Sequence, residues 1–164
     1  MADSMPGRYR RWFDYEIEAH EKVIASLNTV PADQRGSPAF RKAVDLLAHI
    51  AGGRRIWLYR FGKSSDGPPA LFPTGANLDE VIKSLRTTQA HWAEYLATIT
   101  DAELARVFEY QSIDGGRFRN QVEDILTQLF GHSLYHRGQI ATLVRAADGE
   151  PAQTDFVYWT REPI

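Results

Sequence analysis

The sequence predicts a single all-α domain, a four-helix bundle over residues 1–164, and three observations lead to this prediction. Four stretches repeat their apolar residues every three or four positions, which is the period of a helix buried on one face. Proline or glycine, together with polar residues, separates each stretch from the next. The chain of 164 residues, 43% hydrophobic and 24% charged, has the length and composition of one ordinary globular domain.

The first two helices are expected to be antiparallel neighbours. The first runs from about residue 9 to residue 29, with His20 in its apolar stripe, and ends before Pro31. The second begins after Ser37 and Pro38, because serine is a good helix cap and proline fits the first turn, and it continues to about residue 60. Since only a short turn joins them, the two helices should pack side by side in opposite directions.

The last two helices have longer connections. The third opens near residue 77 and continues to about 99, and the fourth begins near 120 and ends before the breaker at 148–151. Residues 61–76 are rich in Gly, Ser and Pro and are long enough to cross the bundle, so the third helix can run parallel to the second. Residues 107–110 and 117–119, around Asp114-Gly115-Gly116, predict a small β-hairpin between helices three and four.

Composition excludes several classes of function. The formal net charge of -2 shows no basic excess, so we expect no nucleic-acid partner bound through phosphate neutralisation. The chain has no cysteine, so any metal must be held by His, Asp or Glu. The N-terminus has no apolar secretory segment, and no apolar run approaches the roughly 20 residues that span a bilayer. We therefore expect a cytoplasmic protein with no membrane partner.

Two histidines of the fourth helix stand out. His132 and His136 are four residues apart, in a stripe that otherwise holds apolar residues such as Leu129 and Ile140, so both imidazoles are expected to point toward the bundle interior. Burying two imidazoles without partners would cost roughly 2–7 kcal/mol for each polar group left unpaired, and a divalent cation would satisfy both. The spacing alone, however, favours a structural or surface role.

A third histidine changes this balance. His49 lies near the middle of the second helix, and His132 and His136 lie near the middle of the fourth. If the two helices pack together, all three rings arrive at the same level. Three His ligands leave positions open for water or substrate, which is typical of a reactive metal site. Nitrogen ligands suit zinc, nickel, copper or iron, and affinity alone does not select among them.

Three strings of this sequence resemble the DinB family of metal-dependent proteins. They are AVDLLAHIAGGRRIWLYRFG at residues 43–62, LFGHSLYHRGQIATLVRAADGEP at 129–151 and TDFVYWTRE at 154–162. The motif H-x-x-x-H-R-G-Q-I in the second string is the most distinctive. The resemblance implies a four-helix bundle with up-down-down-up topology and a metal site built from one histidine of helix two and two of helix four. These positions match His49, His132 and His136. We expect zinc or nickel as the ion, with iron and copper as the alternatives.

Five further residues have more than one interpretation. His20 could be a proton carrier, an extra metal ligand or a hydrogen-bonded core histidine. Arg137 could attract an anionic substrate or pair across helices. Trp57 and Tyr135 are expected to pack, although aromatic rings could also wall a substrate pocket. Asp45 is expected to be a solvated charge, with orientation of an imidazole as the alternative.

Two hypotheses for the function stay open. The first is a metal-dependent enzyme acting on a small molecule, because three neutral ligands leave a cation strongly Lewis acidic. Some relatives in the wider superfamily transfer low-molecular-weight thiols, so the resemblance implies a thiol S-transferase. A metal-bound water would instead make the protein a hydrolase. Without cysteine in the chain, the thiol would come from a small cosubstrate. The second hypothesis is a non-catalytic metal-bound sensor or binding module, forming a homodimer and using a fourth protein ligand.

Overall fold

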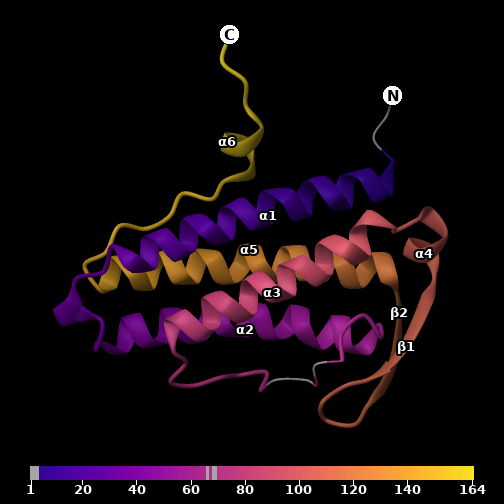
Figure 1. Ribbon diagram of the computed structural model, residues 1–164, viewed down its shortest axis with the longest axis horizontal. Coiled ribbons are helices and arrows are strands. Elements are labelled where there is room, and N and C mark those ends of the chain that lie inside the picture. The colour runs from indigo at the N-terminus through magenta and orange to yellow at the C-terminus, as the bar shows by residue number, and fades with distance from the viewer. Residues whose placement is uncertain (1–3, 66, 68–69) are drawn as a thin grey trace.

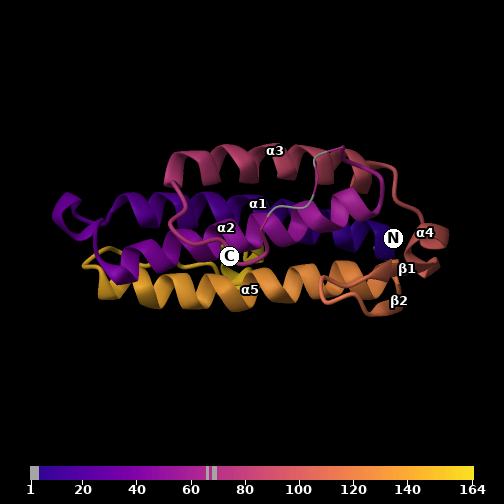
Figure 2. The same ribbon diagram turned by 90° about the horizontal axis from the view of Figure 1, so that it is seen from below.

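The computed structural model describes residues 4–65, 67 and 70–164, and these are mostly helical with one small β-hairpin (Figure 1). Their four long helices are α1 (Met5–Asn28), α2 (Pro38–Arg60), α3 (Leu78–Ala97) and α5 (Val122–Ala146). Figures 1 and 2 show these helices side by side along the long axis of the molecule. α1 and α5 run in one direction, and α2 and α3 run in the other. The predicted helical class and the hairpin are therefore confirmed.

Side-chain caps define where the long helices begin. Ser37 Oγ accepts a hydrogen bond from the Phe40 amide at 3.2 Å, so the predicted start of α2 is confirmed. α1 begins earlier than predicted, because Ser4 Oγ caps it through the Gly7 amide and Pro6 fits the first turn. Within the described part of the chain, no helix has the length and apolar character needed to cross a membrane.

The crossover between α2 and α3 carries the chain back along the molecule, so that α3 starts at the same end as α2 (Figure 1). The sequence predicted this crossover at 61–76, of which residues 66, 68 and 69 lie outside the described residues. Asp45 Oδ1 accepts a hydrogen bond from the Ala76 amide at 2.9 Å. Asp45 therefore links the end of the crossover to α2, and it stays half-exposed, as expected of a solvated charge.

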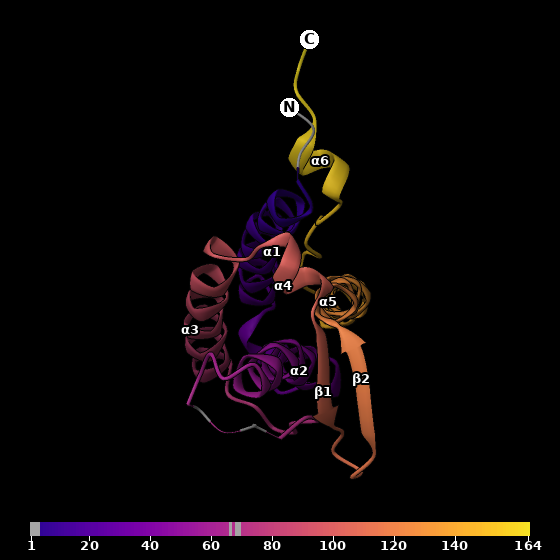
Figure 3. The same ribbon diagram turned by 90° about the vertical axis from the view of Figure 1, so that its right-hand side faces the viewer.

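Short elements precede and follow α5 in the chain. Strands β1 (Val107–Gln111) and β2 (Arg117–Gln121) pair antiparallel, with Val107 opposite Gln121, as the sequence predicted. The preceding helix α4 (Asp101–Ala105), capped by Thr100, was not predicted. The C-terminal helix α6 (Phe156–Thr160) docks on α1, because its Phe156 ring lies 5.0 Å from the Tyr15 ring. Figure 3, viewed end-on, shows the hairpin beside α2 and α5 and shows α6 outside α1.

The core consists of two apolar clusters with polar residues between them. One cluster includes Leu27, Leu47 and Val144, near the turn between α1 and α2, and the other includes Phe13, Trp92 and Leu129, toward the hairpin. Between the clusters, all four long helices contribute buried polar side chains at one level, which we call the polar layer: Glu16, His20, His49, Arg54, Thr88, Gln89, Ser133 and Arg137. This layer was not predicted as a unit, and it contains one of the three candidate ligands.

Candidate metal site

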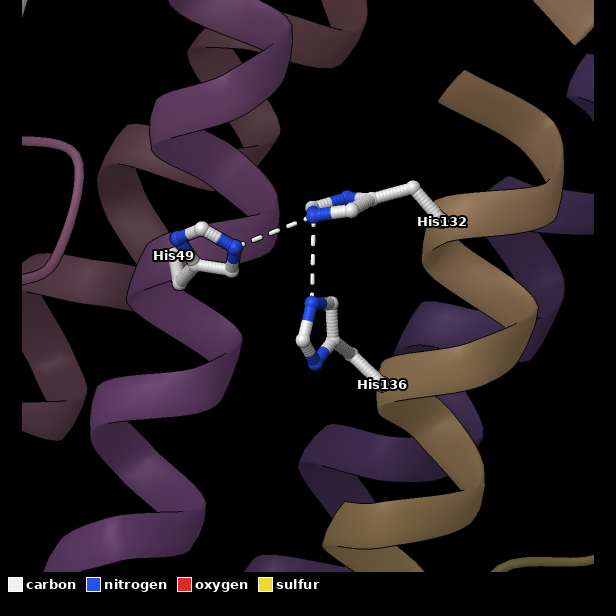
Figure 4. Close-up of side chains that lie close together, drawn as sticks. All are labelled: His49, His132 and His136. Atoms are coloured by element: carbon white, nitrogen blue, oxygen red, sulfur yellow. Dashed lines mark hydrogen bonds between the residues drawn. The ribbon is translucent and has the colours of Figure 1, made fainter. Parts of the chain in front are cut away.

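The three histidines singled out by the sequence lie together between α2 and α5 (Figure 4). His132 Nε2 is 3.0 Å from His49 Nε2 and 3.1 Å from His136 Nε2. One ring nitrogen from each residue lies within 4.8 Å of the others. The close packing of α2 against α5 brings these residues together although 83 positions of sequence separate His49 from His132.

His132 and His136 lie at the edge of the bundle interior, not at its centre. The buried positions of α5 at this level are Ser133 and Arg137, each one residue after a histidine. One residue along a helix is a rotation of about 100°, so the two imidazoles turn from the core toward α2 and stay partly exposed. The expectation that both rings point into the interior is corrected in this respect.

Hydrogen bonds on the outer ring nitrogens orient two of the imidazoles. His49 Nδ1 donates to the Leu71 carbonyl of the crossover, and His136 Nδ1 donates to Gln139 Oε1 at 2.7 Å. Because each proton then sits on Nδ1, the Nε2 lone pairs of both rings face the centre of the cluster. Metal-binding histidines commonly have this outer partner, which fixes the tautomer and the ring orientation.

Two of the three spacings between the ring nitrogens are those expected around one divalent cation. With bonds of about 2.0–2.1 Å, two ligand nitrogens on one ion are separated by about 3.0 Å at a right angle and about 3.3 Å at the tetrahedral angle. The contacts of 3.0 and 3.1 Å lie in this range. A single proton on His132 Nε2 could serve only one of its two neighbours, whereas a cation accepts lone pairs from all three rings. The site could therefore hold zinc, nickel, copper or iron.

The surroundings keep the ligands in the neutral form that binds metal. Burial, with smaller contributions from the neighbouring His136 and His49, lowers the pKa of His132 to about 4. Burial also lowers the pKa of His136, and the hydrogen bond to Gln139 opposes this effect in part. Near neutral pH these two rings therefore need to release no proton before they bind a cation.

A cavity of about 620 Å³ opens beside the cluster, which we call the α2–α5 cavity. It is lined by Lys42, Leu46, His49, Phe72, Tyr135 and His136, among others. The Phe72 ring stacks on His49, with 5.1 Å between ring centroids. Tyr135 is 65% exposed, so it walls the cavity and does not pack in the core. Trp57 packs against the apolar cluster near the hairpin, as expected, and also lines a second cavity. A role of either ring in binding a substrate stays a prediction.

Arg137, from the H-R-G-Q-I motif, pairs across helices. Its Nη1 lies 3.4 Å from Glu16 Oε1, and its Nη2 donates to the Tyr15 hydroxyl at 2.9 Å. Glu16 also accepts a hydrogen bond from Arg54. Of the two interpretations of Arg137, the structure shows pairing across helices. Arg54 and Glu16 were missed, although Glu16 lies on the apolar stripe of its helix, three residues after Phe13.

His20 is a buried member of the polar layer, only 1% exposed. Gln89 Nε2 donates to its Nδ1 at 3.2 Å, and its own Nε2 has no hydrogen-bond partner among the described residues. His20 belongs neither to the three-histidine group nor to the lining of the α2–α5 cavity. This placement matches the hydrogen-bonded core histidine, and a role as proton carrier stays a prediction.

His20 should make the stability of the protein depend on pH. Burial, followed by the charges of Arg54 and Arg137, holds the pKa of His20 well below its ordinary value of 6.5. Below about pH 6.5 the imidazole of His20 is protonated in the unfolded chain and stays neutral in the folded protein. The free energy of unfolding therefore falls as the pH is lowered. We expect urea unfolding of chelator-treated protein to show a smaller free energy at about pH 5.5 than at about pH 7.5.

The His20→Asn variant isolates this contribution. The free energy of unfolding of this variant should change less with pH than that of the wild type. Some dependence on pH should remain, because His132 and His136 also have lowered pKa values. Equal slopes in the two proteins would contradict the assignment to His20.

The fold and the site together define a class: a mostly helical protein with a three-histidine group that could hold a metal ion. The family model of the DinB superfamily matches residues 13–140, and the chain therefore belongs to this superfamily. The match contains all three histidines. The chain is also similar to Protein DinB of Bacillus subtilis (strain 168), with 23% identity over 152 residues that cover 88% of each protein. No solved structure matches the chain.

Proposed function

We propose that the protein is a metal-dependent enzyme acting on a small molecule, either as a low-molecular-weight-thiol S-transferase or as a hydrolase. The observation that carries the proposal is the convergence of three imidazole Nε2 atoms beside an open cavity. Membership of the DinB superfamily supports a metal at this position. The helix directions in Figures 1 and 2 support the up-down-down-up four-helix bundle as the fold of this enzyme.

A divalent cation on three neutral ligands would be a Lewis acid able to lower the pKa of a coordinated water or thiol. Residues of the chain prepare the site for this chemistry. The Leu71 carbonyl and Gln139 hold His49 and His136 in the required tautomer. The α2–α5 cavity, at about 620 Å³, is large enough for a metabolite-sized ligand. Lys42 and Asp45 both line this cavity, and Lys42 supplies a positive charge near His136 that could pair with a thiolate or another anion.

The alternative is a non-catalytic metal-bound sensor or binding module. That alternative expects a fourth protein ligand, such as His20, and no cavity open to solvent. Among the residues that the structure describes, the candidate group contains only three histidines, and a cavity adjoins two of them. Both observations support a site with an open coordination position, and they favour the enzyme.

Two assay panels test the proposal. Protein loaded with zinc or nickel is offered electrophiles, such as chlorodinitrobenzene and monochlorobimane, with and without a low-molecular-weight thiol, and in parallel ester and phosphoester substrates without thiol. We expect turnover in one panel, lost in the His136→Ala variant at the same protein concentration. Inactivity in both panels, with about one ion per chain measured in the same sample, would support the non-catalytic module.

A further inference from the structure

A second cavity, of about 560 Å³, lies on the other side of the histidine cluster, and we call it the hairpin-side cavity. It is formed by Ile56, Trp57 and Arg60 of α2, by Phe72 of the crossover and by Ile113 of the hairpin turn, together with smaller neighbours. Phe72 and Ile113 are 76% and 70% exposed, although both are large and apolar. Exposed apolar side chains that gather around one hollow are typical of a ligand-binding surface.

The hairpin-side cavity adjoins the candidate metal site. Gly53 lines the cavity, and a Cβ atom placed on Gly53 would lie only 3.7 Å from His132 Cε1. Because Gly53 has no side chain, little separates the cavity from the His132 ring. Phe72 lines both this cavity and the α2–α5 cavity, and its ring rests on His49. The histidine cluster therefore lies between two hollows that share one aromatic wall.

Arg60 supplies the positive charge in the lining of the cavity. Arg60 stacks on the Trp57 ring at 4.6 Å, and its Nη2 donates to the Gln111 carbonyl at 2.8 Å. The ion pairs found among the described residues do not include Arg60. No carboxylate of this part of the chain therefore pairs directly with its guanidinium group. Asp114 adds a negative charge at the hairpin turn, where its carboxylate accepts hydrogen bonds from Ser112 and Gly116. An anion would therefore bind at the α2 side of the cavity, where Arg60 lies on the Trp57 ring.

We propose that the hairpin-side cavity binds the aromatic, anionic part of the small molecule on which the three-histidine site acts. The aryl group would lie against Trp57, Phe72 and Ile113, and a carboxylate or sulfonate would pair with Arg60. Gly53 would leave the ligand next to His132. The link to catalysis rests on the proposed function, whereas binding in the cavity does not need the metal.

Naphthalene-2-sulfonate is the probe, and uncharged 2-naphthalenemethanol is its matched control. Calorimetric titration of metal-free protein should show saturable binding of one sulfonate per chain. Arg60→Gln should lower the affinity for the sulfonate about tenfold and leave the affinity for the alcohol unchanged, because only the sulfonate pairs with the positive charge of Arg60. Ile113→Ser should lower the affinity for both ligands, because both lie against the Ile113 side chain. Arg119→Gln removes an exposed arginine of the same hairpin and should change neither affinity.

The outcomes separate this proposal from the proposed function. In protein loaded with copper instead of zinc, the sulfonate's proton NMR signals should broaden, because the ligand lies next to the paramagnetic ion. Binding without broadening in copper-loaded protein would place the ligand away from the metal and would overturn the proposal. Absence of saturable binding, or equal affinities in the wild type and Arg60→Gln, would overturn it too. Binding as expected in a protein that retains no metal would refute the metal-dependent enzyme and leave the anion site standing.

Discussion

Protein purified without chelators is expected to carry about one divalent ion per chain, and the His136→Ala variant to lose it. The wild-type site gathers one ring nitrogen from each of three histidines, with contacts of 3.0 and 3.1 Å between the Nε2 atoms. Loss of an outer hydrogen-bond partner typically lowers metal affinity roughly 10–100-fold. Removing one of the three ligands should lower the metal affinity by more than this. Elemental analysis after gel filtration measures the ratio of metal to protein.

Two further variants make this measurement specific. His91→Ala removes a histidine of α3 that is outside the cluster, so its metal content should equal that of the wild type. Gln139→Ala keeps all three ligands and removes the partner of His136 Nδ1, so its affinity should fall by about 10–100-fold and lie between the two extremes. Equal metal in the wild type and His136→Ala would show that the ion binds elsewhere or not at all.

The histidine cluster could be predicted because it depends on regular helices. Residues four apart share a helix face, and helices of known length place His49 at the level of His132 and His136. The two hydrogen-bond partners of the rings differ in whether the sequence could indicate them. Gln139 follows His136 by three positions and could have been found from helix spacing. The Leu71 carbonyl belongs to the crossover, whose backbone path follows no period, so no pattern in the sequence indicated it.

The polar layer was missed for a different reason. Glu16 and Arg54 occupy interior positions, but a charged residue in an apolar stripe looks like an interruption when its partner is unknown. The partners of Glu16 come from two other helices, Arg54 of α2 and Arg137 of α5, and only the packing of three helices brings them together. The pattern of single helices thus predicted the four long helices, and it could not predict a network that forms between them.

Replacing Glu16 with glutamine is expected to destabilise the protein by about 3–5 kcal/mol. The side chains of Glu16, Arg54 and Arg137 are at most 4% exposed, so the two guanidinium groups would lose their shared counter-charge without gaining water. Glutamine keeps the shape of the side chain and removes only its charge. Urea unfolding of chelator-treated protein near neutral pH gives the free energy of unfolding directly.

The surface pair of Glu21 and Arg86 provides the matched control. Its closest atoms are 2.8 Å apart, yet its side chains are 42% and 57% exposed, so Glu21→Gln should cost no more than about 1 kcal/mol. Equal losses in the two variants would contradict a special role for the buried network.

The buried network should also influence the metal site, because Arg54 and Arg137 come from the two helices that carry the histidines. A triple variant tests the effect on metal affinity separately from the effect on stability. It combines Glu16→Leu, Arg54→Met and Arg137→Met. Replacing a buried ion network by apolar residues of similar size is often neutral or stabilising, so this variant should regain most of the stability that Glu16→Gln loses. If the ion pairs fix α2 against α5, its metal affinity should nevertheless stay below that of the wild type. Wild-type affinity in the triple variant would show that apolar packing alone positions the three histidines.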